Sequence, residues 1–196
     1  MDDVRSLDDP DDGRSQRERM LAGDLYQAWE PSLEEDRRIC RTRTDVYDRS
    51  GHLSAEERLG LLRGMLGAVG DGCEIVPPFR CDYGTYITIG ERSFVNTGAI
   101  MLDCAPITIG SEVLLAGGVQ LLAATHPLDA ATRRAGWELA LPITIGDGAW
   151  LGGGVIVCPG VTIGENTVVG AGSVVVKELP AGVLAVGNPA RIVREL

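Results

Sequence analysis

One aliphatic residue returns at every sixth position along the second half of the chain, and this period constrains the fold more than any other feature. The ladder consists of Ile145, Leu151, Val157, Ile163, Val169 and Val175. Six residues are too few for a helical repeat unit, and this period is the signature of a parallel β-helix. Two shorter ladders precede it: Ile89, Val95 and Met101, then Ile109, Leu115 and Leu121.

A second position in each hexad, four residues after the aliphatic one, carries only small or β-branched side chains. Its members are Ala149, Val155, Val161, Thr167 and Ser173. The two positions are two residues apart across each hexad boundary, as side chains on one side of a strand are, so both sets are predicted to face the interior. Glycines such as Gly146 and Gly152 are predicted to turn tightly or to take unusual dihedrals. We therefore expect a mainly β fold with three short strands per coil of about 18 residues.

Composition limits the class of protein. The chain has 196 residues, of which 44% are hydrophobic, enough for one domain with a sizeable core. It has no apolar run long enough for a membrane span and does not start like a secretory signal, so we expect a cytoplasmic protein. The net charge of −10 argues against non-specific nucleic-acid binding. Five cysteines without a Cys-x-x-Cys pair indicate neither a disulfide framework nor a zinc knuckle.

The chain divides into a tail, a cap and a coil. Residues 1–18 are rich in Asp, Arg and Ser and are predicted to be disordered. Residues 19–70 are predicted to form a helical cap that covers the open end of the solenoid. Its expected helices have Leu21, Leu25 and Ala28 on one face, then span 33–47 and 54–66, the last starting with the capping box of Ser54 and Glu57. Residues 71–196 are predicted to form the β-helix, ending near Pro180 before a basic C-terminal tail.

One segment interrupts the hexads, at about residues 122–142. An insertion of this length in a regular solenoid is a long loop, and long loops are commonly functional. It carries His126, one of two histidines in the chain; the other, His52, lies in the predicted cap.

Several motifs occur in a fixed order: Met20–Tyr26, Phe79–Gly84, Met101–Asp103, Ala124–Pro127, Pro142–Gly146 and Gly187–Arg191. Together they resemble the maltose O-acetyltransferase family of hexapeptide-repeat acyltransferases, whose relatives include galactoside and nodulation-factor acetyltransferases. The resemblance covers residues 19–196. It implies a left-handed β-helix, assembled as a homotrimer, in which acetyl-CoA and the acceptor meet in a cleft between neighbouring subunits. It also implies acetyl transfer to a hydroxyl of a small sugar such as maltose or glucose.

The resemblance assigns His126 as the general base. A neutral imidazole is suited to remove the proton of an attacking hydroxyl, and no Gly-x-Ser-x-Gly motif is present, which favours direct transfer. Asn96 matches the family asparagine that stabilises the developing oxyanion, since an amide donates without titrating. The alternatives are a plain loop histidine and an asparagine that bonds a coil corner.

The resemblance also assigns acceptor-binding residues: Asp82, Asp103 and Tyr83. Either carboxylate could instead accept hydrogen bonds from turn amides. Two departures from the family bear on the acceptor. Ala28 stands where galactoside acetyltransferases have an acidic residue that contacts the sugar, and Thr97-Gly98 replaces bulkier residues.

For acetyl-CoA, the matching positions are Trp150, Gly153, Ala171, Lys177, Arg191 and Arg194. The small residues would let the pantetheine arm lie close to the backbone, and the basic residues would neutralise the phosphates of CoA. Trp150 could instead serve packing or the trimer interface, and Arg194 could belong to a solvated tail. No metal is expected to be required.

Two other functions remain open. One is a hexapeptide acyltransferase with a different acceptor, such as an antibiotic, another glycoside or a sugar nucleotide. The other is a non-catalytic trimeric scaffold. A γ-type carbonic anhydrase is set aside, because it needs three histidine ligands per site and the chain has two histidines.

Overall fold

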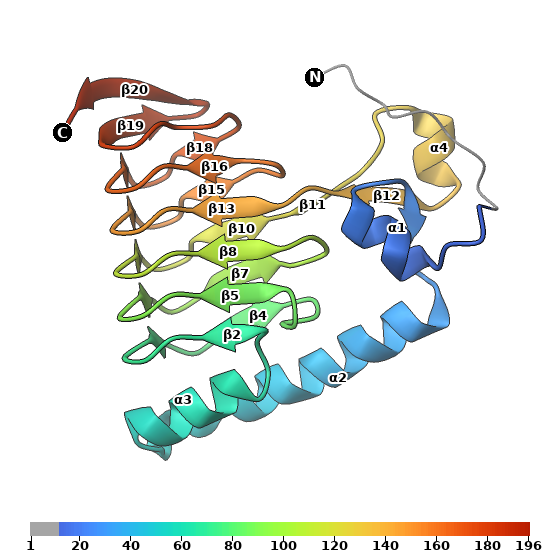
Figure 1. The fold of residues 1–196 in the computed structure, drawn as a ribbon, viewed down its shortest axis with the longest axis horizontal. Helices are drawn as coiled ribbons and strands as arrows, with labels where there is room; N and C mark the ends of the chain where they lie inside the picture. The colour runs from blue at the N-terminus through green and yellow to red at the C-terminus, as the bar shows by residue number, and fades with distance from the viewer. Residues whose placement is uncertain (1–11) are drawn as a thin grey trace.

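The computed structural model describes residues 12–196 and shows a parallel β-helix with helices at its N-terminal end (Figure 1). The first sheet contains β2 (Ala68–Val69), β5 (Ile87–Ile89), β8 (Ile107–Ile109), β13 (Ile143–Ile145) and β16 (Thr162–Ile163). The second contains β3 (Glu74–Ile75), β6 (Phe94–Val95), β9 (Leu114–Leu115), β14 (Trp150–Leu151), β17 (Val168–Val169), β19 (Val183–Gly187) and β20 (Ala190–Glu195). The third contains β4 (Phe79–Cys81), β7 (Ala99–Leu102), β10 (Gln120–Leu122), β15 (Ile156–Val157) and β18 (Val174–Val175). The predicted fold class is confirmed.

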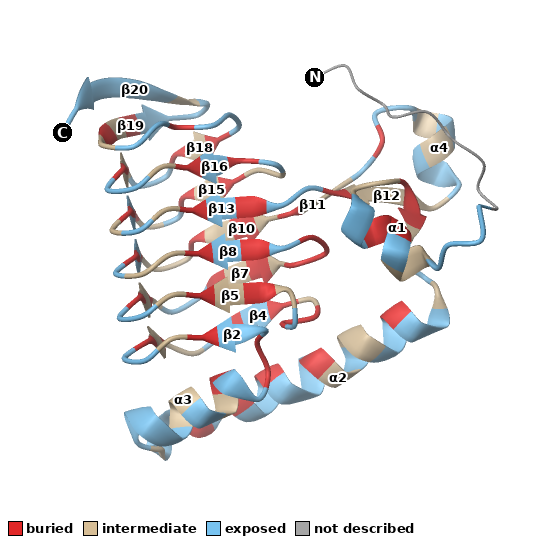
Figure 2. Cartoon of the chain, in the orientation of Figure 1, coloured by how far each residue is buried: buried red, intermediate tan, exposed pale blue. Residues whose placement is uncertain are grey.

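The core is the stack of inward side chains that the hexad pattern predicts. Every member of the long aliphatic ladder is at most 1% exposed, and all five members of the second set are buried. Buried residues run through the stacked strands in Figure 2. Each large aliphatic side chain removed from water in this way contributes about 1.5–3 kcal/mol before entropy is counted.

The three outer faces differ although the interior is uniform. On the first sheet the outward residues form a threonine face: Thr88, Thr108, Thr144 and Thr162. On the second they form an aromatic face: Phe94, Leu114, Trp150 and Val168. On the third they form an isoleucine face: Ile100, Gln120, Ile156 and Val174. Two of the three faces are therefore largely apolar.

The corner glycines Gly146 and Gly152 do not take the unusual dihedrals that are one of the two roles predicted for them. Neither has a positive φ angle. A Cβ on Gly146 would lie 2.6 Å from the backbone nitrogen of Glu165, and one on Gly152 would lie 2.6 Å from that of Ala171. Glycine is required there because the next coil passes too closely for any side chain.

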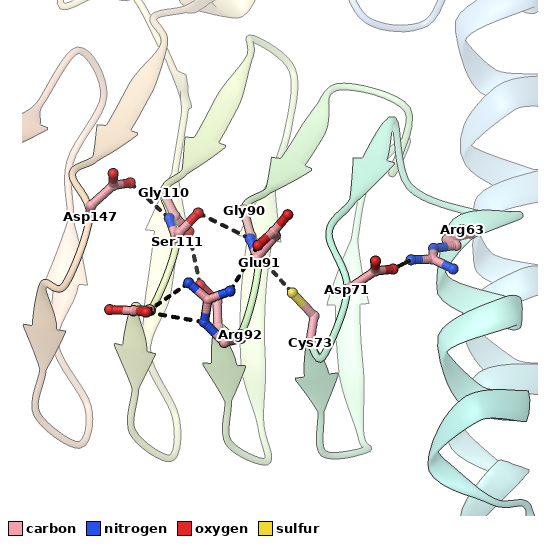
Figure 3. A network of polar contacts seen from close by, with 11 residues as sticks. Arg63, Asp71, Cys73, Gly90, Glu91, Arg92, Gly110, Ser111 and Asp147 are labelled. Atoms are coloured by element: carbon pink, nitrogen blue, oxygen red, sulfur yellow. Dashed lines mark hydrogen bonds and ion pairs between the residues drawn. The ribbon is translucent and has the colours of Figure 1, made fainter.

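Three edges join the faces. The polar edge, between threonine and aromatic faces, is held by hydrogen bonds and ion pairs of Glu91, Arg92, Ser111, Glu112 and Asp147 (Figure 3). The small-residue edge, between aromatic and isoleucine faces, includes Asn96, Gly117, Gly153 and Ala171. The insertion edge, where the isoleucine-face strands end, holds Asp82, Asp103 and the inserted segment of about residues 122–142, which we call the excursion.

The early coils are longer than the predicted 18 residues. Thr88 pairs with Thr108, 20 residues on, whereas Thr144 pairs with Thr162, 18 residues on. The extra residues lie at the insertion edge.

The N-terminal helices are α1 (Gln16–Ala22), α2 (Pro31–Asp48) and α3 (Ala55–Arg63), with a short 3-10 turn, η1 (Ser50–His52). Ser54 and Glu57 form the predicted capping box. The predicted helical face of Leu21, Leu25 and Ala28 is wrong, because Gly23 takes a φ of +74° and ends α1 before Leu25.

The helices lie against the first coil, as Figure 1 shows for α2 and α3. The backbone N–H of Phe79 donates to Asp48 of α2 at 3.0 Å, and Arg58 of α3 forms an ion pair with Glu74 at 2.8 Å. Of the predicted disordered tail, residues 1–11 lie outside the described residues. Its last three residues, 16–18, belong to α1, which Ser15 caps.

The excursion forms a small sheet beside the coil. Strand β11 (Ala124–Thr125) pairs antiparallel with β12 (Trp137–Ala140), which pairs in turn with β1 (Tyr26–Gln27) of the cap. Helix α4 (Ala130–Arg134) closes the loop between β11 and β12. The start of the cap, α1 and β1, and the excursion therefore form one structural unit, set to the side of the coil (Figure 1).

The C-terminus is not a loose tail. Strand β19 adds to the aromatic-face sheet by parallel pairing with β17, and β20 folds back on β19 as an antiparallel strand. The reversal occurs at Gly187, which has a φ of +104°. Arg191 and Arg194 therefore lie on an ordered strand. In residues 12–196 no helix is both long and apolar enough to cross a membrane.

Candidate active site

Asp103 organises the insertion edge. It lies directly after β7 and is fully buried. One carboxylate oxygen accepts from the backbone N–H groups of Asp82 and Tyr83 at 3.0 and 2.9 Å, and the other accepts from Tyr86 at 3.3 Å. These contacts match the alternative in which Asp103 satisfies turn amides. In this chain the carboxylate shapes the corner that carries Asp82.

Asp82 is the more accessible carboxyl of the two. It lies directly after β4 and is half-buried, and the Cys104 thiol donates to its Oδ2 at 3.4 Å. Burial raises the pKa of Asp82, while the Cys104 hydrogen bond and the charges of Arg37 and Arg41 lower it. Burial also raises the pKa of Asp103 to about 6. The edge thus holds two neighbouring carboxyls, only one of which can reach a ligand.

Tyr83 connects this edge to the cap. Its ring is buried and packs edge-on against Tyr86, with ring centroids 5.6 Å apart. Its hydroxyl accepts a hydrogen bond from Arg37 of α2 at 2.6 Å, and the same guanidinium donates to the carbonyl of Ala28 at 2.5 Å. Arg37 therefore fixes the cap against the predicted acceptor-binding residues.

His126 follows β11 at the end of the excursion arm. Its imidazole is exposed and has no hydrogen-bond partner within residues 12–196. The next residue, Pro127, is buried, and Arg133 of α4 donates to its carbonyl oxygen at 2.8 Å. The backbone at His126 is thus held while the ring nitrogens stay available.

Asn96 lies at the small-residue edge, before β7. Its Oδ1 accepts from the backbone N–H of Thr97 at 2.7 Å, so it does bond a coil corner. That bond occupies the amide oxygen and leaves the NH₂ group as the available donor. The corner contact and a role as an oxyanion donor are therefore compatible.

The predicted acetyl-CoA residues fall in two groups. Gly153 and Ala171 occupy equivalent corners of successive coils on the small-residue edge, and the N–H of Gly172 bonds the carbonyl of Gly153 at 2.9 Å. Trp150, half exposed, flanks this edge on the aromatic face. The edge is therefore a strip of backbone beside an indole, and such a strip suits an extended, uncharged segment of a ligand.

Lys177, Arg191 and Arg194 form the second group, near the C-terminal end of the coil. All three are exposed, and none forms an ion pair with any residue from 12 to 196. In a chain with a net charge of −10, these three cations give one end of the coil a local positive charge.

The structure brings some predicted residues together and separates others. Asp82, Tyr83, Asp103 and the arm with His126 gather at the insertion edge, whereas Asn96 lies at the opposite edge of the same sheet. The four residues of β7 separate them, roughly 13 Å at about 3.3 Å per residue. The sequence interpretation missed Arg37 and Cys104. Arg37 is one of several arginines in α2 and has no distinguishing pattern, but the break in the hexad ladder between Met101 and Ile109 marks the corner that holds Cys104.

No group of three or more His, Cys, Asp or Glu side chains in residues 12–196 is arranged to hold a metal ion. All five cysteines are free thiols. The side chains described at the two edges are an imidazole, two carboxyls, a phenol, a thiol and an amide.

Comparisons with known proteins show the family of the chain. Residues 19–70 match the family model of the maltose acetyltransferase hexapeptide capping motif, and residues 142–177 match that of the bacterial transferase hexapeptide, six repeats. The chain is 46% identical to nodulation protein L of Rhizobium leguminosarum bv. viciae over 91% of its own length and 94% of the relative.

Solved structures give the same picture. A maltose O-acetyltransferase from Clostridium difficile 630 superimposes with a TM-score of 0.91 and 42% identity, over 93% of this chain and 98% of the other. A hexapeptide-repeat acetyltransferase from Vibrio cholerae O1 biovar eltor, complexed with acetyl coenzyme A, gives a TM-score of 0.86 and 39% identity, over 93% and 99%.

Proposed function

Because the chain belongs to the maltose O-acetyltransferase family of hexapeptide-repeat acyltransferases, we propose that it transfers the acetyl group of acetyl-CoA to a hydroxyl of a small sugar such as maltose or glucose. The observation that carries the proposal is the imidazole of His126, exposed and unbonded at the end of an arm that Arg133 holds in place. This is the arrangement that a base acting on a diffusing substrate requires.

In the proposed reaction, His126 takes the proton of the sugar hydroxyl as the oxygen attacks the thioester carbonyl carbon. The C–O bond forms, the C–S bond breaks, and the proton on His126 passes to the leaving thiolate of CoA. General-base assistance of this kind contributes typically about 10²–10⁴-fold. No covalent acyl-enzyme is needed, because the two substrates react directly in a ternary complex.

Asn96 is proposed to stabilise the negative charge that develops on the carbonyl oxygen. Its free NH₂ group is a suitable donor, since Thr97 already occupies the amide oxygen. Asn96 and His126 lie at opposite edges of one sheet, so we propose that a neighbouring subunit of a homotrimer supplies one of them. The apolar aromatic and isoleucine faces on either side of the small-residue edge favour such an assembly.

Acetyl-CoA is proposed to lie along the small-residue edge, against Gly153, Ala171 and Trp150, with its phosphates near Lys177, Arg191 and Arg194. The narrow strip of backbone fits the pantetheine arm, and the unpaired cations fit the phosphates. Asp82, with Tyr83 beside it, is proposed to bind acceptor hydroxyls, whereas Asp103 positions Asp82. We also propose a cytoplasmic location, since free acetyl-CoA is a cytoplasmic metabolite.

The test is release of the CoA thiol from acetyl-CoA with maltose, glucose, galactosides and chloramphenicol as acceptors. His126→Ala should lower a sugar-dependent signal at least about 100-fold, and His52→Ala is the matched control, because His52 is the other histidine and lies on the cap. Wild-type turnover in His126→Ala would overturn the mechanism. A signal with chloramphenicol alone would reassign the acceptor, and a chain that does not bind acetyl-CoA would be a scaffold.

A further inference from the structure

A hollow of about 400 Å³ lies on the cap at the start of α2. Its walls are the indole of Trp29 and the side chains of Glu34, Glu35, Arg37, Arg38 and Arg41. The hollow lies beside the excursion as well, because Gly136, between α4 and β12, lies close to the edge of the indole. A Cβ built on Gly136 would be 4.0 Å from Trp29 Cδ1.

Trp29 is the first unusual feature of this hollow. Its side chain is 70% exposed, although tryptophan is buried on average in folded proteins. The neighbouring residues Tyr26 and Ala28 are buried, so the local backbone is packed while the indole is left open to solvent. An exposed aromatic ring beside a hollow offers a flat apolar surface for a ligand.

The charged side chains around the indole are not equivalent. Arg38 is paired with Glu35 through two hydrogen bonds of 2.7 and 2.6 Å, and Arg37 is engaged by Tyr83 and Ala28. Arg41 is exposed, and its guanidinium forms no hydrogen bond or ion pair within residues 12–196. It lies one helical turn from Arg37, on the same face of α2. Its guanidinium donors are therefore available.

The hollow lies next to the predicted acceptor site. Arg37 lines the hollow and donates to Tyr83 of the insertion edge. The charges of Arg37 and Arg41 both act on the neighbouring Asp82 carboxyl. Arg37 and Arg41 therefore line the hollow and also act on the Asp82 carboxyl, so the hollow and the predicted acceptor site are neighbours.

We propose that this hollow binds a second sugar ring of the acceptor, which stacks its apolar face on Trp29 while its hydroxyls accept hydrogen bonds from Arg41. The inference rests on the proposed function and narrows the acceptor class from a small sugar to an oligosaccharide of at least two rings. The aromatic plane and the free, forked donor suit a sugar ring, which has apolar C–H faces and a polar rim.

The experiment compares sugars that differ only in length: glucose with maltose and maltotriose, galactose with lactose, and glucosamine with its β-1,4 dimer. Steady-state kinetics and calorimetric binding, the latter without acetyl-CoA, are measured for wild type, Trp29→Ala and Trp29→Phe. Val46→Ala is the matched control, because Val46 is an exposed apolar residue of α2 outside the hollow.

In whichever of the three sugar series the wild type uses best, Trp29→Ala should lower kcat/KM for the longer sugars about tenfold. The change should lie in KM, because a remote stacking contact binds the substrate and the transition state equally. The monosaccharide should change less than about twofold, and Trp29→Phe should recover part of the loss. An equal loss for short and long sugars, or no loss, would overturn the inference.

The calorimetric binding measurement distinguishes failure of this inference from failure of the proposed function. If no sugar is acetylated but longer sugars still bind in a Trp29-dependent way, the proposed function fails and the second-ring site stands. If sugars are acetylated but wild type binds two rings no more tightly than one, the second-ring site is wrong and the proposed function stands.

Discussion

The two edges of the isoleucine face are built from the same hexads but present different chemistry. Where the strands begin, the small-residue edge has corners of Gly117, Gly153 and Ala171, with one amide, Asn96. Where the strands end, the insertion edge holds Asp82, the buried Asp103 and the excursion with His126. One edge presents mainly backbone, and the other presents carboxyl and imidazole side chains.

The difference follows from where the coil tolerates extra residues. The inward ladders need a fixed register, so insertions can be placed only at corners, and in this chain they collect at the insertion edge. At the small-residue edge the coils stay in close register next to Gly152, where a Cβ would lie 2.6 Å from the backbone nitrogen of Ala171. A single chain therefore holds the two halves of the proposed site on opposite edges, and the proposed function requires two chains to complete it.

Subunit complementation tests this conclusion with the largest expected effect. Alone, His126→Ala should lose about 10²–10⁴-fold in kcat and Asn96→Ala about 10²–10³-fold. Coexpressed with different tags and purified through both, mixed trimers of the two variants should recover about a third of wild-type activity, because each mixed ring has one intact junction out of three. Purification through two different tags and assay of CoA release measure the recovery.

The control is coexpression of either variant with itself under both tags, which should give no recovery. If the mixed assembly shows only the sum of the two residual activities, His126 and Asn96 act within one chain. The contrast between the edges would then describe the fold and not the active site.

The buried carboxyl of the insertion edge predicts a pH effect on stability. The pKa of Asp103 in the folded state, about 6, lies above the ordinary value of 3.8. The contribution of Asp103 to the free energy of unfolding is therefore full below about pH 4 and is lost as the pH rises through 6. The loss is of the order of 3 kcal/mol at most. Urea unfolding of the wild type between pH 4.5 and 7.5 should follow this trend.

Asp103→Asn should remove that pH dependence and cost about 1–3 kcal/mol at pH 4.5, because its NH₂ group cannot accept from the buried N–H groups. Asp147→Asn, at the exposed polar edge, is the control for removing a charge. If the free energy of unfolding of Asp103→Asn falls with pH as it does in the wild type, another group causes the pH dependence.

Most of the coil could be predicted from sequence because its inner positions are dictated by a short-range pattern. A side chain such as Leu151 or Val157 must point inward once the hexad register is set, and both are fully buried. The capping box at Ser54 was predictable for a similar reason, since its partners are three residues apart. Such features need no knowledge of distant contacts.

The features that the sequence did not predict depend on distant contacts. The pairing of Tyr26 with Glu138 joins segments more than 100 residues apart, so the end of α1 and the strand that follows it could not be read from helical spacing. Arg37 joins the cap to the insertion edge through its hydrogen bonds to Tyr83 and Ala28. Asp103 shapes its corner by accepting hydrogen bonds from three backbone N–H groups of another coil. For the same reason residue type alone could not separate a buried carboxylate from a ligand-binding one.

At the small-residue edge, a larger side chain should affect the co-substrate and not the fold. A Cβ on Gly153 would meet only the carbonyl oxygen of Gly117, at 3.5 Å, so Gly153→Val should fold. It should raise KM for acetyl-CoA about tenfold by filling the strip of backbone, while KM for the sugar stays within about twofold. Ala181→Val, exposed at the polar edge, is the control. Equal effects on both substrates would place acetyl-CoA elsewhere.

The smallest expected effect concerns the cations at the end of the coil. Arg194→Ala should raise KM for acetyl-CoA about three- to fivefold at low ionic strength, and the effect should shrink as salt is added, because an exposed charge contributes at most about 1 kcal/mol and is screened. Arg92→Ala is the control, an arginine of the polar edge that is already paired with Glu112 at 2.8 Å. An unchanged KM at low salt would assign Arg194 to the solvated surface, and the phosphates of CoA would then depend on Lys177 and Arg191 alone.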